Sequence, residues 1–287
     1  LGGIECRVRD LSRRRRIVEI RRGGENFHQM ESLQEMDGGR MRAAPSRMAP
    51  LKEARLDSLE SMMDVARRPE TLAERLPARP GEGRKLSLRT RKRRKYWKEA
   101  ETVMRLGMVD LAHEQVVAVG SESRSCRRRS FLLTEYEEGS LPLDDFLRLE
   151  FPRSNRLFGD KVGELRRLTA RIAETLRIFH ELGYRGRNFS AGRIQVRRLR
   201  NGEYQARIAG TEDVLSPRRA GDRGRFRDLV GLLASTPEPL TGRLRAAAFL
   251  KAYLNVSKLG SREKKWVGVV LAALAGKFTR EPVFPSR

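Results

Sequence analysis

The sequence predicts an α+β fold with two lobes, in which a small antiparallel sheet forms the N-terminal lobe and helices form the C-terminal lobe. Two observations support this prediction. Strand-like stretches and turn signals prevail over residues 76–136, whereas from residue 165 onward apolar residues recur at steps of three and four. A chain of 287 residues with 39% hydrophobic content is also long enough to bury a core. We therefore expect the two lobes at residues 53–137 and 138–287.

The first 52 residues are predicted to be a disordered basic segment. They combine arginine clusters, such as RRRR at 13–16, with glycine pairs, and they show no sustained apolar period. Such a segment cannot bury enough apolar surface to offset the entropy of ordering it. A functional basic arm is the alternative interpretation. The chain begins with Leu1, and Met30, Met41 and Met48 are candidate later translation starts.

Composition limits the classes of function. The formal net charge of +24 attracts any polyanion, including a phosphorylated glycan, an anionic membrane surface or a nucleic acid. Two cysteines in unrelated contexts give neither a disulfide framework nor a zinc site of the CxxC type. The longest apolar run, residues 266–276, is too short to span a bilayer and is typical of a buried helix. We expect a cytoplasmic protein, soluble or peripheral to a membrane.

In the first lobe, a Pro/Gly turn within residues 76–90 separates two strand-like stretches, which is typical of a glycine-rich hairpin. Residues 96–106 have helical spacing. The next part of the chain, residues 116–136, has the pattern of a strand, a polar loop and a second strand. These patterns predict a strand-rich lobe with one helix.

In the second lobe, an amphipathic helix begins near Leu165 and ends near Gly183. A hairpin follows, with Asn201-Gly202 as a two-residue turn between alternating segments. Three further helices are predicted from their apolar spacing, at residues 225–234, 244–254 and 264–277.

The order of helix, loop, strand, turn and strand over residues 165–210 resembles the catalytic centre of a protein kinase. Residues 180–196 (HELGYRGRNFSAGRIQV) align with that family's loop without a gap. The segments FLLTEYEEGSLPLDDFLR, FRDLVGLLAS and RAAAFLKAYL are similar to the lipopolysaccharide kinase branch, whose members phosphorylate Kdo or heptose sugars of the inner core. The resemblance covers about residues 53–260. It implies a two-lobed protein-kinase-like fold, ATP and magnesium as cofactors, and the lipopolysaccharide inner core or another phosphorylated glycan as partner at the inner membrane.

The catalytic loop departs from the family pattern. Where the family has His-Arg-Asp, this chain has Gly186, Arg187 and Asn188. Arg187 and Asn188 are therefore the candidate catalytic residues, but the Asn188 amide at the position of the base cannot accept the hydroxyl proton. Where the family has a magnesium-binding asparagine, this chain has Arg193. The fixed positive charge of Arg193 would repel the metal.

A second metal-binding carboxylate is missing after the following strand. Where the family has an aspartate, the chain has Ala209-Gly210. Glu212 and Asp213 lie slightly downstream and are possible substitutes if the loop is rewound. This rescue is the alternative to a site without metal ligands, because a metal site needs its ligands close to ideal distances.

The nucleotide-binding positions of the first lobe also differ from the family. The strand KLSLRTRK places Arg89 at the position of the ATP-binding lysine, with Lys85 or Lys92 as alternatives. Glu99 is its expected partner on the helix, Glu101 is second, and solvated surface charges are the alternative for both. Gly81 and Gly83 belong to a candidate glycine-rich loop over the nucleotide.

Two positions of the family pattern are retained. His180 falls at the end of the long helix, and Asp228 matches the aspartate that holds the backbone of the catalytic loop, so the resemblance implies structural roles for both. A chain that keeps these residues and loses the chemical ones favours a pseudokinase or very weak phosphotransferase. Two alternatives stay open: an active sugar kinase with Glu212 or Asp213 as displaced metal ligands, and a basic polyanion-binding protein.

Overall fold

The computed structural model describes the chain in segments. These are residues 4–12, 15–22, 25–26, 34–36, 41–43, 51–56, 58, 61–62, 65, 84–92, 96–124, 127–137, 139–152, 160–215, 221–237 and 243–276. Gly81 and Gly83 lie outside the described residues. The chain divides into two compact units, the first made of Leu1–Pro77, Leu88–Tyr96 and Val116–Leu133, and the second of Ala78–Ser87, Trp97–Gln115 and Thr134–Arg287.

The first unit contains most of a five-stranded sheet. Its strands follow the order β4 (Gln34–Met36), β5 (Met41–Ala43), β7 (Glu114–Arg124), β8 (Arg127–Glu137) and β6 (Arg84–Lys92). β5 pairs antiparallel with β7, with Arg42 opposite Val119. Apolar residues of β7 and β8, including Val119 and Phe131, are fully buried. The strands predicted over residues 116–136 are thus present and slightly longer than expected.

Strands also occur where the sequence predicts disorder. Within residues 1–52, β1 (Ile4–Ser12), β2 (Arg15–Arg22) and β3 (Glu25–Asn26) form a separate antiparallel sheet. Its register places Cys6 opposite Ile20 and Val8 opposite Val18. These apolar residues alternate with charged ones in the period of a strand, a pattern that the arginine clusters obscure.

The second unit includes α4 (Trp97–Gly107), which the sequence assigns to the first lobe. The turn after α4 explains this division, because it binds β12 (Tyr204–Ile208) through both backbone and side chains. Ile208 N donates to Leu111 O at 2.7 Å, and His113 N donates to Ile208 O at 3.0 Å. The Asp110 carboxylate accepts hydrogen bonds from Gln205 and Arg207.

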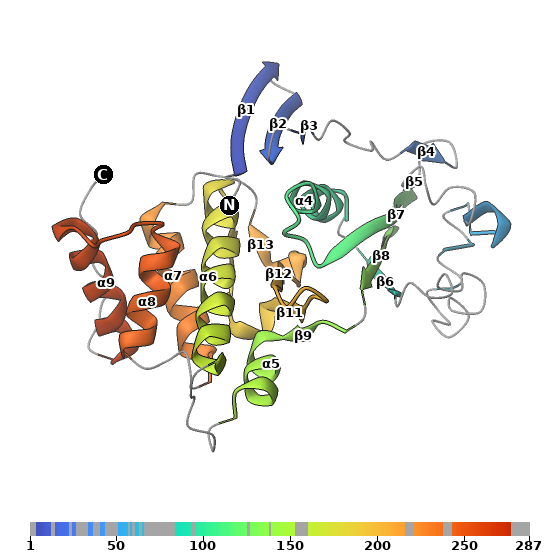
Figure 1. The fold of residues 1–287 in the computed structure, drawn as a ribbon. Helices are drawn as coiled ribbons and strands as arrows, with labels where there is room; N and C mark the ends of the chain where they lie inside the picture. Colours follow the sequence, from blue (N-terminus) through green and yellow to red (C-terminus); the bar gives the residue numbers. More distant parts are fainter. Residues whose placement is uncertain are drawn as a thin grey trace. The chain divides into compact units, whose positions relative to one another are not determined.

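In the second unit, the long helix α6 (Asp160–Glu181) packs against α8 and β12, and α9 in turn packs against α7 and α8 (Figure 1). Leu168, Ile172, Leu176 and Phe179 form its fully buried stripe. α7 (Asp222–Ser235), α8 (Arg243–Tyr253) and α9 (Ser261–Leu274) match the three predicted C-terminal helices to within a few residues. α5 (Leu143–Glu150) was not predicted. This short amphipathic helix buries Leu143, Phe146 and Leu147.

Short strands position the loop of residues 187–193, which carries the candidate catalytic residues. The predicted hairpin consists of β11 (Ile194–Arg198) and β12. The turn between them contains Gly202 with φ +78°, a backbone conformation that favours glycine. β9 (Leu141–Pro142) pairs with the other edge of β11. β10 (Arg185–Gly186) pairs with β13 (Val214–Leu215), so the two loops that carry the candidate site residues lie side by side. Among the described residues, no helix has both the length and the apolar character needed to cross a membrane.

Candidate functional site

The loop between β10 and β11 carries the candidate catalytic residues. Arg187 and Asn188 are exposed, whereas the next residue, Phe189, is buried. The Phe189 ring lies 5.8 Å, centroid to centroid, from the ring of Phe179 at the end of α6. Phe189 therefore anchors the loop in the core and leaves the Asn188 amide facing solvent.

α7 holds the backbone of this loop by two hydrogen bonds. Gly186 N donates to Asp228 Oδ2 at 2.8 Å, and Ala191 N donates to Ser235 Oγ at 2.8 Å. Gly231 allows the approach, because a Cβ there would overlap the carbonyl oxygen of Phe189. The sequence prediction singled out Asp228 but missed Ser235 and Gly231, since neither belongs to a motif whose partner can be identified without the fold.

His180 completes a buried polar network beneath the loop. Its Nε2 lies 3.0 Å from Asp228 Oδ2, and its Nδ1 lies 2.8 Å from the hydroxyl of Tyr253 on α8. An ionised carboxylate only accepts hydrogen bonds, so Nε2 carries the proton and donates to Asp228. Nδ1 then accepts from the Tyr253 hydroxyl. With a neutral imidazole, each donor in this network has an acceptor.

The buried environment of His180 makes stability depend on pH. Burial lowers the pKa of His180 and outweighs the opposing effect of Asp228, while the positive charge of Arg225 lowers it further. As the pH falls below about 6.5, the unfolded chain takes up a proton at this residue that the folded chain does not. We expect the contribution of His180 to the free energy of unfolding to be complete above this pH and to decline below it, by at most about 1.4 kcal/mol per pH unit.

Urea unfolding of the wild type and of His180→Gln between pH 7.5 and 5.5 measures this dependence. The glutamine side chain does not titrate, so the difference between the two curves isolates the histidine. Parallel curves for the two proteins would contradict the assignment.

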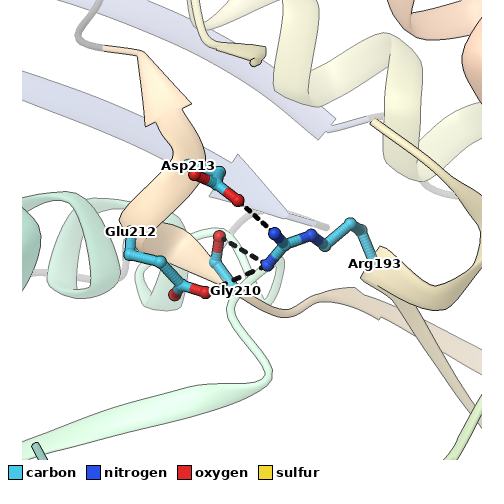
Figure 2. A network of polar contacts seen from close by, with 4 residues as sticks. All are labelled: Arg193, Gly210, Glu212 and Asp213. Atoms are coloured by element: carbon cyan, nitrogen blue, oxygen red, sulfur yellow. Dashed lines mark hydrogen bonds and ion pairs between the residues drawn. The ribbon is translucent and has the colours of Figure 1, made fainter. Parts of the chain in front are cut away.

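The side chain of Arg193 lies among oxygen atoms of the segment that follows β12. Its Nη1 is 3.0 Å from Glu212 Oε1 and 3.4 Å from the carbonyl oxygen of Gly210, and its Nη2 contacts Asp213 Oδ2 (Figure 2). Two carboxylates and one carbonyl therefore surround one guanidinium group. We call these three oxygen-bearing residues the oxygen cage.

Gly210 makes room for this guanidinium. It has φ +68° and ψ +50°, the left-handed conformation that favours glycine. A Cβ at Gly210 would overlap Nη1 of Arg193 and lie 2.8 Å from its Cζ. Gly210, expected with Ala209 at the position of a metal-binding aspartate, is thus sterically matched to Arg193, expected at the position of a metal-binding asparagine.

Backbone hydrogen bonds lock the two segments together. Ala209 N donates to the carbonyl oxygen of Arg193 at 2.9 Å, which places the start of the Arg193 side chain beside Gly210. Arg187 N donates to the carbonyl oxygen of Asp213 at 2.9 Å. A short 3-10 turn at Thr211–Asp213 then presents Glu212 and Asp213 to the guanidinium. The cage therefore follows from local backbone geometry as well as from charge.

The residues at this site do not fit magnesium. Magnesium takes about six oxygen ligands in near-octahedral geometry, but here the guanidinium already contacts the oxygens of Glu212 and Asp213. The described residues contain no group of three or more His, Cys, Asp or Glu side chains arranged to hold a metal. The candidate substitutes Glu212 and Asp213 are brought together, but around Arg193.

The candidate nucleotide-binding residues belong to different units. Arg89 lies in β6 in a part of the strand that belongs to the first unit, and Glu99 lies in the first turn of α4 in the second unit. Both residues are partly buried. The predicted pairing of Arg89 with Glu99, and the glycine loop over a nucleotide, stay predictions.

A shallow pocket lies on the face of the β11–β12 hairpin that does not pack on α6. It is small, with a volume of about 10 Å³ that suits about one water molecule, and it is lined by polar side chains: His113, Ser140, Gln195, Arg197, Gln205 and Arg207. One of its two guanidinium groups, that of Arg207, binds Asp110, with Nε at 3.0 Å from the carboxylate. The side chains of the lining are all polar, so they offer hydrogen-bond donors and acceptors rather than a broad apolar surface.

Comparison with known proteins shows the fold. No family model and no curated protein sequence matches the chain. A solved structure described as WaaP in complex with acyl carrier protein is similar, with a TM-score of 0.51 and 18% sequence identity. The match covers 70% of this chain and 86% of that chain. The predicted α+β, two-lobed kinase-like fold is confirmed.

Proposed function

We propose that this chain is a lipopolysaccharide-kinase-like pseudokinase. It binds a phosphorylated glycan of the inner-core type and transfers phosphate very weakly or not at all. The observation that supports this best is the contact of Arg193 with Glu212 and Asp213, because it engages the two carboxylates that follow Gly210 in the chain and were the candidate replacement ligands. The structural likeness to WaaP supports the kinase-like fold on which the proposal depends.

Two losses act on the chemistry at once. Asn188 replaces the base, and the absence of a general base typically costs a factor of about 10² to 10⁴ in rate. The metal that would neutralise the transferred phosphoryl group has no free carboxylate to bind in the oxygen cage. An active sugar kinase with Glu212 and Asp213 as displaced ligands would first have to break both contacts with Arg193.

The ligand class is supported by charge and by the polar pocket. A net charge of +24 attracts phosphorylated or anionic ligands, including the surface of the inner membrane from the cytoplasmic side. The pocket is too small to enclose a sugar, but the guanidinium, amide, hydroxyl and imidazole groups around it can contact hydroxyl and phosphate groups of a ligand that lies across its mouth. The same net charge supports the second candidate, a polyanion-binding protein, whose affinity for nucleic acid would fall steeply with salt.

A transfer assay tests the proposed function. Purified chain, ATP and magnesium are incubated with an acceptor oligosaccharide that contains phosphorylated Kdo or heptose, and phosphate incorporation is measured. We expect no incorporation above the reaction without protein. We also expect the acceptor alone to raise the Tm, and Arg197→Ala in the polar pocket to reduce that increase.

Two controls separate the alternatives. Magnesium-dependent transfer that disappears in Asp213→Ala would support the displaced-ligand kinase and overturn the pseudokinase proposal. Asn188→Asp restores the base but not the metal ligands, so it is expected to stay inactive. A Tm that rises equally with any polyanion and is insensitive to Arg197→Ala would favour the polyanion-binding alternative.

A further inference from the structure

We infer that Arg193 is a built-in cation that occupies the oxygen cage in place of a divalent metal, so the segment after β12 is ordered without any metal ion. The inference concerns how this segment keeps its structure. It deepens the proposed function and rests on its claim that magnesium does not bind here. The inference is tested by measurements of Tm without nucleotide or acceptor. A result against the inference is therefore distinct from phosphate transfer, which would overturn the proposed function.

The three oxygen atoms of the cage are of the types that bind hard cations. Carboxylate and backbone carbonyl oxygens are typical ligands of magnesium and calcium. In this chain, Glu212 Oε1, Asp213 Oδ2 and the Gly210 carbonyl oxygen all contact Arg193 instead. Two adjacent carboxylates on one short turn repel each other, and the guanidinium offsets this repulsion.

The guanidinium is held in place by the chain itself. Arg193 N donates to Ser190 O at 3.0 Å, and the carbonyl oxygen of Arg193 accepts from Ala209 N. The side chain therefore reaches the cage from a fixed backbone, and its attachment gives it a high effective concentration there. The Arg193 side chain is only 28% exposed, so the contact is partly shielded from salt. A free metal ion must lose water and displace this group to bind.

Gly210 provides independent support for the inference. It is the residue whose Cβ would overlap the guanidinium, and it is also the residue whose carbonyl oxygen contacts it. The guanidinium thus fills space that any other side chain at this position would need. The residues at positions 193 and 210 therefore depend on each other. Arg193 supplies the cation, and Gly210 leaves the space that the guanidinium fills.

Removal of the guanidinium is expected to expose a cation site. Thermal unfolding of wild-type chain and Arg193→Ala is measured in EDTA, in magnesium chloride and in calcium chloride, with sodium chloride added to match ionic strength. We expect the Tm of the wild type to stay unchanged on addition of either metal. The Tm of Arg193→Ala is expected to be lower than that of the wild type in EDTA and to rise by about 2–4 °C at ten times the Kd of the metal.

Arg207→Ala provides the matched control. It removes a guanidinium from the neighbouring strand, where that group binds the Asp110 carboxylate. We expect no metal response there, because the chain neighbours of Asp110 are Val109 and Leu111 and supply no second carboxylate on the same turn. Arg193→Met is a second variant that keeps the apolar stem of the side chain, and its Tm is expected to rise with metal as that of Arg193→Ala does.

Three results would overturn the inference. The first is a wild-type Tm that rises with magnesium or calcium as much as that of Arg193→Ala. The second is the absence of a metal response in both Arg193→Ala and Arg193→Met. The third is an equal response in Arg207→Ala, which would show general binding of cations to released carboxylates.

Discussion

Asp228→Ala is expected to lower the free energy of unfolding by about 3–5 kcal/mol, the range for removing one partner of a buried charged network. The Asp228 carboxylate is 2% exposed and accepts hydrogen bonds from His180 Nε2 and from Gly186 N. Alanine leaves both of these donors buried without their acceptor. The loss falls on the base of the β10–β11 loop, so local opening of that loop is expected as well.

Two variants calibrate this prediction. Asp228→Asn keeps an oxygen that accepts from both donors but loses the charge, so we expect a smaller loss of about 1–2 kcal/mol. Asp145→Ala removes an exposed carboxylate on α5 and is expected to change stability by less than about 0.5 kcal/mol. Urea unfolding measures all three, and hydrogen exchange at the amide of Gly186 reports on the loop. A loss below about 1 kcal/mol for Asp228→Ala would contradict the role assigned to this network.

The elements that the sequence predicted well are those whose pattern is local. The stripe from Leu168 to Phe179 specifies one face of α6 by its spacing alone, and Asn201-Gly202 specifies the turn of the β11–β12 hairpin. The boundary of the first lobe was less predictable. α4 belongs with the second unit because the turn after it pairs with Ile208, a contact that no local pattern in residues 96–115 indicates.

The candidate site shows the same limit more clearly. The sequence indicated that Arg193 would repel a metal and that Glu212 and Asp213 were candidates to replace the lost ligands, as two separate considerations. In the structure Arg193 contacts both carboxylates, because the conformation of Gly210 turns the chain back toward it. A single sequence shows which residue types are present, but a left-handed backbone at a glycine depends on the surrounding fold.

The match between Gly210 and Arg193 leads to the second large effect. Gly210→Ala is expected to destabilise the chain by about 2–4 kcal/mol, above the usual effect of a surface substitution. Part of this loss, about 1–2 kcal/mol, is the strain of a side chain in the left-handed region. The remainder arises because the new methyl group displaces the Arg193 guanidinium and leaves Glu212 and Asp213 without it.

Gly202→Ala separates these two contributions. Gly202 has φ +78° but no atom within 4 Å of the position that a Cβ would take, so its substitution measures strain alone. We expect it to cost about 1–2 kcal/mol, clearly less than Gly210→Ala, when both are measured by urea unfolding.

A double-mutant cycle decides whether the guanidinium is the cause of the difference. If the methyl group acts by displacing Arg193, then Arg193→Ala has already removed what Gly210→Ala destroys. The double variant is then expected to be about as stable as Gly210→Ala alone, with a coupling of about 1–2 kcal/mol. Independent effects that simply add would mean that the glycine serves only the backbone. A strong coupling would instead mean that positions 193 and 210 are constrained as a pair, so a change at either one alone is disfavoured even where no catalysis is at stake.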